Sequence, residues 1–360
     1  MVRGFSRLRL LASLSVVGAV ATLAGYGWFV WKMTTPADPA GGQIEVVIDR
    51  GTTFDSAAET LYYHGLIPDI QLFSLRARQQ DKRGKLRAGL YVFDLKMTPD
   101  EVLDKLAGAP DAPIDKVPLK FQIIPGDNIW RIAERLHQLG IEESLLEFDA
   151  DPAQVAALKV GPNPKPARAH TRLEGYLFPE TYHLDRKNPS LTRALRAATS
   201  QFQREWRALK SKHAGRYASL RKKYKMTDHD FVTMASLVEK EVAALAEAPT
   251  VAKVFYNRFD TRMRLATDPT MVYGPDTWKS KPSPTFRRDK THPYNTYHVR
   301  GLPPGPICSP SRHSLEAVLN PSHSDALYFV ARRDGTGRHA FAKTLKQHKA
   351  NIDTYLKGKR

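Results

Sequence analysis

A long apolar segment near the start of the chain predicts a membrane-spanning helix. Residues 10–31 run for 22 positions without a charged side chain, and about 20 apolar residues are needed to cross a bilayer. Arg3, Arg7 and Arg9 precede this segment, so the positive-inside rule predicts a cytoplasmic tail at residues 1–9 and translocation of the rest of the chain. A cleaved signal peptide is the alternative, but its apolar core would be only about 7–15 residues long.

A repeat follows a Pro/Gly-rich linker at residues 32–43. Each copy has a short β-like run, a turn, and a helix with apolar residues at i, i+3, i+4 and i+7 that ends at a glycine. The copies occupy residues 44–66 and 121–141, in a register 75 positions apart. We expect them to share one small sheet in a module over residues 44–145. The module resembles the LysM type, a small β/α fold that binds cell-wall glycans; a repeat with only a packing role is the alternative.

The chain from residue 146 onward has the pattern of a mixed α+β domain. Polar helical periodicity predicts one or two long helices before residue 226, and two more apolar helices follow. A segment rich in Pro, Asn and Tyr then predicts loops. The elements expected are helices at 190–225, 227–248, 249–260 and 343–356 and a strand at 328–331.

Composition and charge narrow the chemistry. The 55 Lys and Arg residues outnumber the 37 Asp and Glu residues, which gives a net charge of +18. A basic translocated domain suits an acidic polymer outside the membrane, and without a recognition motif we expect no nucleic-acid partner. The lone Cys308 excludes an intramolecular disulfide, and the chain has no zinc-type Cys/His spacing, P-loop or dinucleotide motif. We therefore expect neither a metal nor a cofactor.

The helix predicted from residue 227 carries two candidate catalytic carboxyls, Glu239 and Glu241. Thr227 and Asp230 have the spacing of a capping box at its start. At about 100° per residue, Glu241 falls on the apolar face, whereas Glu239 falls on its flank. Burial raises the pKa of a carboxyl and makes it a candidate general acid. The alternative is a Glu at the end of the stripe that reaches solvent or pairs with an Arg.

A second polar cluster follows the next predicted helix. Asp268 precedes a proline, which disfavours helical backbone at that position. Amide, hydroxyl and phenol groups suit sugars, because they donate to and accept from hydroxyl and acetamido groups and tyrosine adds an apolar face. The candidate substrate-binding residues are Asp268, Thr270, Tyr273, Asn295 and Tyr297.

These segments together resemble the YceG-like endolytic murein transglycosylase family. The resemblance extends over nearly the whole chain from residue 10 and rests on several motifs in a fixed order. The motifs are Leu173-Glu174-Gly175 through Tyr182, Ala235-Ser236-Leu237-Val238-Glu239-Lys240-Glu241, Asn257-Arg258 through Gly274, Tyr294-Asn295-Thr296-Tyr297, Gly301-Leu302-Pro303-Pro304-Gly305 and His339-Ala340-Phe341 with Thr344-Leu345.

The resemblance implies cleavage of the β-1,4 bond between N-acetylmuramic acid and N-acetylglucosamine inside peptidoglycan glycan strands. The product end would be a 1,6-anhydro sugar, and one carboxyl would serve first as acid and then as base. That role maps onto Glu241, with Glu239 as the alternative or as an orienting partner. Val242 departs from the hydroxyl residue that is common next to the catalytic Glu in related enzymes, so the carboxyl must be oriented by other groups.

The resemblance also implies an organisation and a location. We expect a transmembrane helix at 10–31, the LysM-like module and a transglycosylase domain at 146–360. The catalytic part would be periplasmic at the inner membrane, beside peptidoglycan synthases. Two alternatives stay open: a wall-binding tether without activity, and a hydrolytic muramidase with a second carboxylate about 5–9.5 Å away, for which Asp268 is the candidate.

Overall fold

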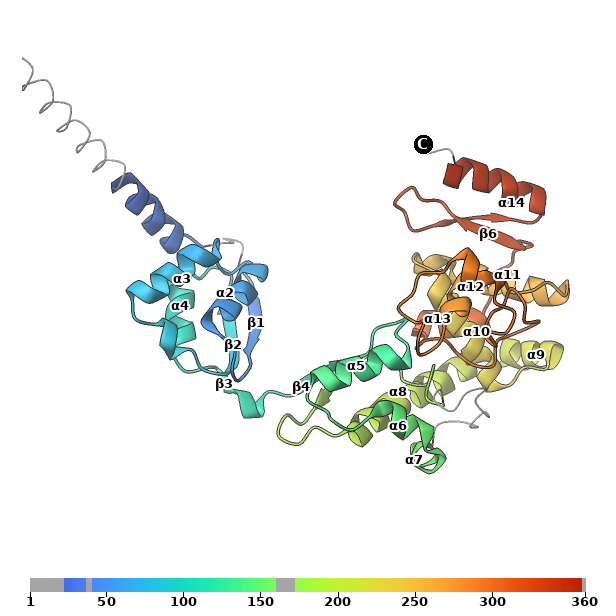
Figure 1. The fold of residues 1–360 in the computed structure, drawn as a ribbon, viewed down its shortest axis with the longest axis horizontal. Coiled ribbons are helices and arrows are strands. Elements are labelled where there is room, and N and C mark those ends of the chain that lie inside the picture. Colours follow the sequence, from blue (N-terminus) through green and yellow to red (C-terminus); the bar gives the residue numbers. More distant parts are fainter. Residues whose placement is uncertain (1–22, 37–40, 160–171, 358–360) are drawn as a thin grey trace, which may run out of the picture. The chain divides into compact units, whose positions relative to one another are not determined.

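The computed structural model describes residues 23–36, 41–159 and 172–357. They divide into two compact units, unit 1 up to Pro118 and unit 2 from Leu119 onward. Helices and short sheets occur in both, so the expected α+β class is confirmed (Figure 1). Residues 23–34 are helical. Within the described ranges no helix has the length and apolarity to cross a membrane, and residues 10–22 of the expected span lie outside those ranges.

Unit 1 packs three helices against a small antiparallel sheet in the order β1-β2-β3. The side chains of β2 alternate, so that Tyr91 and Phe93 are fully buried, while Phe54 and Phe73 stack with their ring centroids 5.7 Å apart. The elements of unit 1 are β1 (Gln43–Ile48), α2 (Phe54–Tyr63), α3 (Ile70–Gln79), η1 (Arg83–Lys85), β2 (Gly89–Asp94), α4 (Pro99–Ala107), β3 (Ala112–Pro113) and η2 (Ile114–Lys116).

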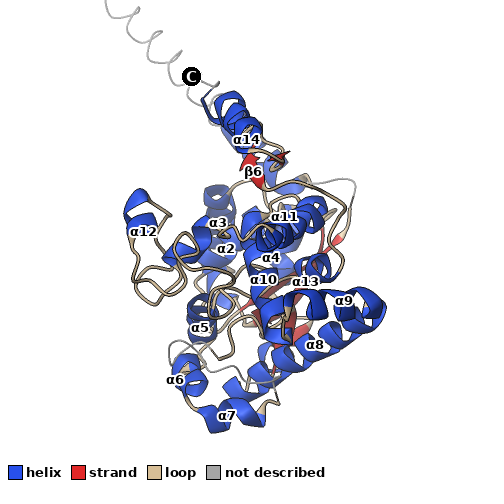
Figure 2. Cartoon of the chain, turned by 90° about the vertical axis from the view of Figure 1, so that its right-hand side faces the viewer, coloured by secondary structure: helices blue, strands red, loops and turns tan. Residues whose placement is uncertain are grey.

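Unit 2 is mainly helical (Figure 2), and its described residues include two short two-stranded sheets. Its first half contains β4 (Leu119–Gln122), α5 (Ile129–Gln138), α6 (Leu145–Ala150), α7 (Pro152–Ala157), β5 (Thr181–Leu184), α8 (Leu191–Lys212) and α9 (Ala214–Tyr224). Its second half contains α10 (Asp228–Glu241), η3 (Leu245–Glu247), α11 (Ala248–Asp260), η4 (Asp268–Val272), α12 (Pro284–Arg288), α13 (Arg312–Leu319), β6 (Tyr328–Ala331), β7 (His339–Ala342), α14 (Leu345–Ile352) and the π-helical turn η5 (Asp353–Lys357).

The two copies of the repeat form the same local structure but do not share a sheet. Each is a strand followed by a helix, β1–α2 and β4–α5, with Thr53 and Asn128 as the N-caps. However, β4 pairs with β5, where Phe121 lies opposite Tyr182. Side chains of the second copy join the core of unit 2, whereas those of the first copy form a separate core. The structural division therefore falls after residue 118 and not after residue 145, because the strand partner of the second copy comes from much later in the chain.

The middle of helix α10 is buried on all sides within unit 2. The predicted capping box is present, since the side chain of Thr227 accepts from the backbone of Asp230 and that of Asp230 accepts from the backbone of Thr227. Residues 231–238 are all buried, and α11, α13 and η4 pack around the helix. Because the helix is enclosed in this way, the backbone of its last residue, Glu241, is held in a fixed position.

The turn at Gly175 shows how closely other segments approach α10. Gly175 has a φ of +82°, and a Cβ there would stand 2.6 Å from Cβ of Pro306 and 3.1 Å from Cγ1 of Val232 on α10. Both the backbone conformation and the space therefore require glycine at this position.

We predict that Gly175→Ala lowers the free energy of unfolding by about 2–4 kcal/mol, through backbone strain and overpacking. Urea denaturation of the full chain measures this. Gly215→Ala is the matched control, because Gly215 lies in α9 with no atom within 4 Å of its would-be Cβ. In this control the free energy of unfolding should rise by about 0.5 kcal/mol or stay unchanged. If the two substitutions changed the free energy of unfolding equally, the requirement for glycine at position 175 would be contradicted.

Candidate active site

Glu241 presents a carboxyl with no protein partner at the C-terminal end of α10. Within the described residues it makes no hydrogen bond or ion pair. Burial raises the pKa of Glu241 to about 7; the negative charge of Asp268 acts in the same direction and Arg258 acts against it. The negative end of the helix dipole also disfavours a carboxylate at this position. Glu241 can therefore give up and take back a proton near neutral pH.

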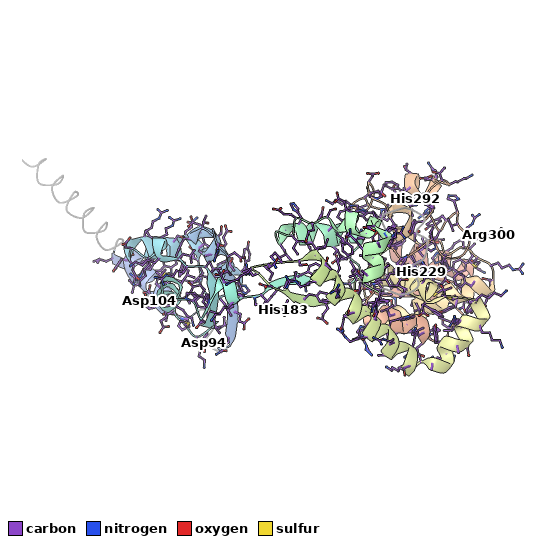
Figure 3. All side chains as sticks on the ribbon, turned by 90° about the horizontal axis from the view of Figure 1, so that it is seen from below. Asp94, Asp104, His183, His229, His292 and Arg300 are labelled. Atoms are coloured by element: carbon purple, nitrogen blue, oxygen red, sulfur yellow. The ribbon has the colours of Figure 1, made fainter. Side chains whose placement is uncertain are left out.

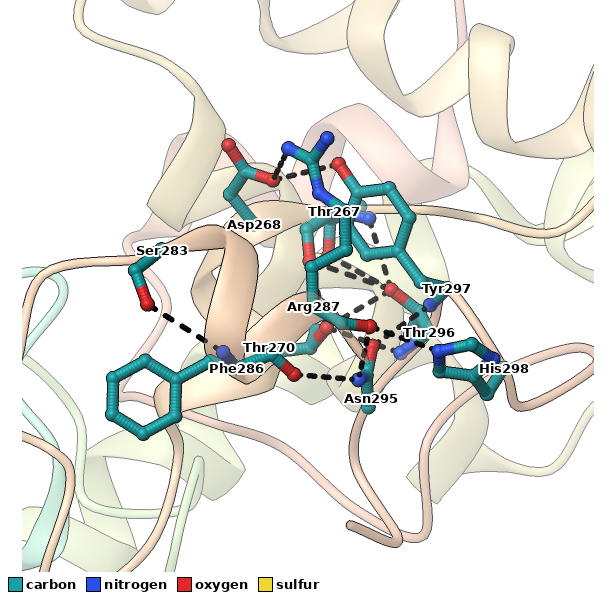
Figure 4. Close-up of polar contacts among 10 residues, drawn as sticks. All are labelled: Thr267, Asp268, Thr270, Ser283, Phe286, Arg287, Asn295, Thr296, Tyr297 and His298. Carbon is teal, nitrogen blue, oxygen red and sulfur yellow. Dashed lines mark hydrogen bonds and ion pairs between the residues drawn. The ribbon is translucent and has the colours of Figure 1, made fainter. Parts of the chain in front are cut away.

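Asp268, the first residue of η4, is the acidic neighbour of Glu241, and Figure 4 shows its contacts with Tyr297 and Arg287. Its Oδ1 accepts from the hydroxyl of Tyr297 at 2.6 Å and from the guanidinium of Arg287 at 3.2 Å. Burial raises the pKa of Tyr297, and the contact with Asp268 raises it further. Tyr297 therefore stays a neutral donor, and together with Arg287 it holds the Asp268 carboxyl in one orientation.

Arg258 on α11 places a buried positive charge near Glu241 without bonding to it. Its Nε donates to the carbonyl of Leu327 at 2.8 Å, and its Nη1 donates to the carbonyl of Leu265. Burial lowers the pKa of Arg258, while the charge of Glu241 opposes that change. Because the guanidinium is fixed by carbonyl oxygens, it moderates the charge at Glu241 and leaves the carboxyl free.

Glu239 is engaged in holding two helices together. Its Oε2 accepts from the backbone N–H of Ser311 at 2.8 Å and from the Ser311 hydroxyl at 2.6 Å. Ser311 is the N-cap of α13, so this carboxylate joins α10 to the start of α13. Of the two candidate carboxyls, only Glu241 is free of protein partners within the described residues, whereas the catalytic role itself stays a prediction.

The side chains of Thr270 and Asn295 bond to the surrounding loop segments (Figure 4). The Thr270 hydroxyl donates to the carbonyl of Thr267 at 2.7 Å and bonds to the hydroxyl of Thr296 at 2.9 Å. The Asn295 amide donates to three carbonyls of the segment 286–289, at 2.7–3.2 Å. Both side chains are fully buried. In this structure they support the positions of Asp268 and Tyr297.

Tyr273 is buried in a cluster of tilted aromatic rings. It bonds to Glu174, which the sequence patterns did not single out as a site residue. The ring of Tyr273 lies 5.0 Å from Trp130 and 4.6 Å from Tyr294, centroid to centroid, and its hydroxyl donates to Oε2 of Glu174 at 2.8 Å. The same oxygen accepts from the N–H of Ile129 at 3.0 Å, whereas Oε1 has no partner. Burial raises the pKa of Glu174 to about 8.

The structure thus brings together three of the predicted residues, Glu241, Asp268 and Tyr297. It adds Arg258 and Arg287, which sequence reasoning missed as site residues. Arg258 belongs to the motif that runs from Asn257 to Gly274. An arginine within the apolar pattern of a predicted helix was the sequence feature that could have indicated a site residue. Arg287 gave no signal apart from a local run of charge. His229, labelled in Figure 3, is the second residue of α10, at the opposite end of the helix from Glu241, and it bonds to Tyr176 at 2.8 Å.

Comparison with known families identifies the kind of protein. A model of the YceG-like family matches residues 46–354, which is most of the chain. The chain belongs to the YceG-like family. The crystal structure of a YceG-like protein from Listeria monocytogenes superposes with a TM-score of 0.61 at 31% identity, over 86% of this chain and 98% of that one.

Two curated relatives of this family member are named endolytic murein transglycosylase. The Bacillus subtilis (strain 168) protein is 38% identical over 189 residues, which is 52% of this chain and 49% of the relative. The Streptococcus pneumoniae serotype 2 (strain D39) protein is 31% identical over 348 residues, which is 91% of this chain and 59% of the relative. The chain thus spans between half and three-fifths of the length of these relatives.

We predict that the buried Glu174 makes stability fall as pH rises. Its pKa in the folded state is about 8 against 4.5 for an ordinary Glu. Between these values the folded protein keeps a proton that the unfolded chain releases, so the free energy of unfolding decreases with pH. Glu174→Gln should flatten this dependence, as measured by urea unfolding from about pH 5 to about pH 8. Glu142→Gln, at an exposed position, is the control, and equal slopes in all three proteins would contradict the prediction.

Proposed function

We propose that this protein is an endolytic peptidoglycan transglycosylase whose acid and base is Glu241. The carrying observation is the Glu241 carboxyl, which has no protein partner within the described residues and whose pKa burial raises to about 7. A group that must act first as an acid and then as a base works best with a pKa near the working pH. Membership of the YceG-like family and the names of two relatives support the same activity.

The proposed reaction uses Glu241 twice and consumes no water. Protonated Glu241 donates its proton to the glycosidic oxygen as the bond from C1 of N-acetylmuramic acid breaks, and N-acetylglucosamine leaves with a free 4-hydroxyl. The 6-hydroxyl of the same muramic acid then attacks C1, and its proton passes to the Glu241 carboxylate. The acid is regenerated, and the strand ends in 1,6-anhydro-N-acetylmuramic acid. Asp268 favours the positive charge that develops at C1.

A hydrolytic muramidase is the second candidate, and the proximity of Asp268 to Glu241 favours it. A hydrolase needs a second carboxylate as base or nucleophile, and Asp268 is the acidic side chain that raises the pKa of Glu241. However, Oδ1 of Asp268 already accepts from Tyr297 and Arg287. These contacts suit a fixed charge better than a group that must bind and activate water. A tether without activity is the third reading.

The proposal includes a location and partners. Residues 10–31 would anchor the chain in the inner membrane, with the tail inside and both units in the periplasm beside peptidoglycan synthases. Trp28 and Trp31 are 52% and 57% exposed on the helical stretch at the end of this segment, which suits the membrane–water interface. Unit 1 would bind glycan as a LysM-like module, and the order β1-α2-α3-β2 with β1 antiparallel to β2 supports it.

We predict that Glu241→Gln lowers the rate of cleavage of purified glycan strands by about 10²–10⁴-fold, because it removes the only group assigned to proton transfer. The full chain in detergent should give new ends one water lighter than reducing sugars, read by mass spectrometry. Glu239→Gln is the matched control and should still cleave, since Glu239 bonds to Ser311.

Three results would contradict the proposal. Reducing ends would indicate the hydrolase and assign Asp268 as the second carboxylate. Full activity of Glu241→Gln with loss in Glu239→Gln would reverse the two roles. If the parent protein and both variants bound the polymer without cleaving it, the result would support a wall-binding tether without activity.

We predict that Asp268→Asn moves the alkaline limb of the pH–rate profile to lower pH. The Asp268 charge helps to keep Glu241 protonated, so its removal lowers the pKa of Glu241. The acid then ionises, and the rate falls, at a lower pH. Asp325→Asn removes the same charge from an exposed ion pair with Lys343 and should leave the limb in place. A limb that does not move in Asp268→Asn, or that moves equally in both variants, would contradict the electrostatic role.

A further inference from the structure

A cavity of about 380 Å³ lies in unit 2 between α5, α6 and the turn that follows η4. Helix α5 contributes Trp130 and Glu134 to its lining, and the turn contributes Asp276, Trp278 and Lys279. Helices α5 and α6 pack side by side at this point (Figures 1 and 2). None of these side chains takes part in the site around Glu241.

We infer that this cavity is a second sugar-binding site, which holds the glycan strand at a distance from the bond that is cleaved. The inference rests on the proposed function and names a further contact with the same polymer.

The aromatic wall of the cavity is rigid. The rings of Trp130 and Trp278 are nearly parallel, 18° apart with centroids at 6.5 Å. Trp130 is only 7% exposed and rests against Tyr273. The Trp278 N–H donates to the carbonyl of Gly274 at 3.0 Å, so the turn that carries it is closed by its own backbone. Lys279 Nζ lies over the Trp278 ring, 4.7 Å from its centroid. The C–H face of a pyranose ring can stack on this flat, electron-rich ring by displacing the exposed lysine side chain.

The polar rim suits an uncharged sugar better than an anion. Lys279 pairs with Glu134 at 2.5 Å, Asp276 is exposed, and the guanidinium of Arg131 lies 5.5 Å from the Trp278 ring centroid. The lining itself holds two carboxylates and one cation, with the Arg131 guanidinium beside it, so the rim lacks the excess of positive charge that an anion would need. The carboxylates can accept from hydroxyl and acetamido groups while the cations donate to sugar oxygens. A phosphate would meet both carboxylates, which disfavours a nucleotide or a phospholipid headgroup.

The position of the cavity favours the glycan strand over an unrelated sugar. The turn directly continues η4, whose first residue is Asp268, and the Thr277 hydroxyl bonds to the last carbonyl of η4, that of Val272, at 2.9 Å. Five residues of 3₁₀ helix rise by about 10 Å. A polymer of sugars can therefore contact the Asp268 region and the turn at the same time, and a second grip along the strand would bias where the enzyme cuts.

The test compares Trp278→Ala, Trp278→Phe and Leu345→Ala in the full chain. Leu345 is 50% exposed and outside both sites, which makes it the control for removing a large apolar side chain. Dissociation constants for long purified glycan strands are measured in the Glu241→Gln background. KM, kcat and the lengths of the products are measured with Glu241 intact.

Trp278→Ala should weaken binding of long strands by about 3- to 10-fold, the value of one aromatic contact. The loss should appear in KM, grow with strand length and change the lengths of the products. Trp278→Phe should restore most of the affinity, and Leu345→Ala should match the parent protein.

Two results would overturn the inference while the proposed function stands: Trp278→Ala indistinguishable from Leu345→Ala, or an equal loss on short and long strands with a lowered unfolding midpoint, which would indicate a structural role only. If the parent protein neither binds nor cleaves glycan strands, the proposed function fails and this inference fails with it.

Discussion

The burial of α10 is the constraint on which the arrangement of unit 2 depends. Because residues 231–238 are enclosed on all sides, the helix cannot turn or slide without displacing its neighbours. The segment before α13 is attached to it at several points, since Ile307 donates its N–H to the Ser236 hydroxyl at 3.0 Å and Ser311 donates to Glu239. The Glu241 carboxyl at the end of this helix has no protein partner within the described residues, so packing alone holds it in place.

The Glu241 carboxyl is positioned by packing and not by hydrogen bonds, and its proposed chemistry explains why. A carboxylate that accepts hydrogen bonds or pairs with a guanidinium has a lowered pKa and stays ionised near neutral pH. Arg258 is close enough to affect Glu241, but its guanidinium donates to the carbonyls of Leu327 and Leu265. Had it paired with Glu241, the general acid would be lost. The buried arginine thus limits the rise in the pKa without removing the proton.

Local patterns predicted the start of α10 well because they depend on neighbours in sequence, whereas the predicted end at residue 248 was wrong, since α10 ends at Glu241. The period of 3.6 residues placed Glu241 on the apolar face, and the spacing of Thr227 and Asp230 predicted the capping box that is present. The helical periodicity could not predict that Glu239 would bond to Ser311, which lies 72 positions later in the chain. The role of Thr270 also depends on a distant contact, since it bonds across 26 positions to Thr296. The role of Asn295 depends on carbonyls six to nine positions earlier in the chain. A Thr or Asn in a loop has the same sequence signature whether it binds a ligand or a neighbouring carbonyl. For the same reason the sequence predicted both copies of the strand–helix repeat but not that β4 pairs with β5.

In the proposed reaction, one fixed charge serves two stages. Before cleavage, Asp268 raises the pKa of Glu241 and keeps the proton available. When the glycosidic bond breaks, Glu241 becomes a second carboxylate beside Asp268, and this repulsion would oppose the step if nothing positive appeared with it. The oxocarbenium-like carbon supplies that positive charge in the same place, so both carboxylates stabilise it. As the 6-hydroxyl attacks, the positive charge disappears, the repulsion returns, and Glu241 is driven to take back the proton. Asp268 needs no proton transfer of its own for this role, which is consistent with its contacts to Tyr297 and Arg287.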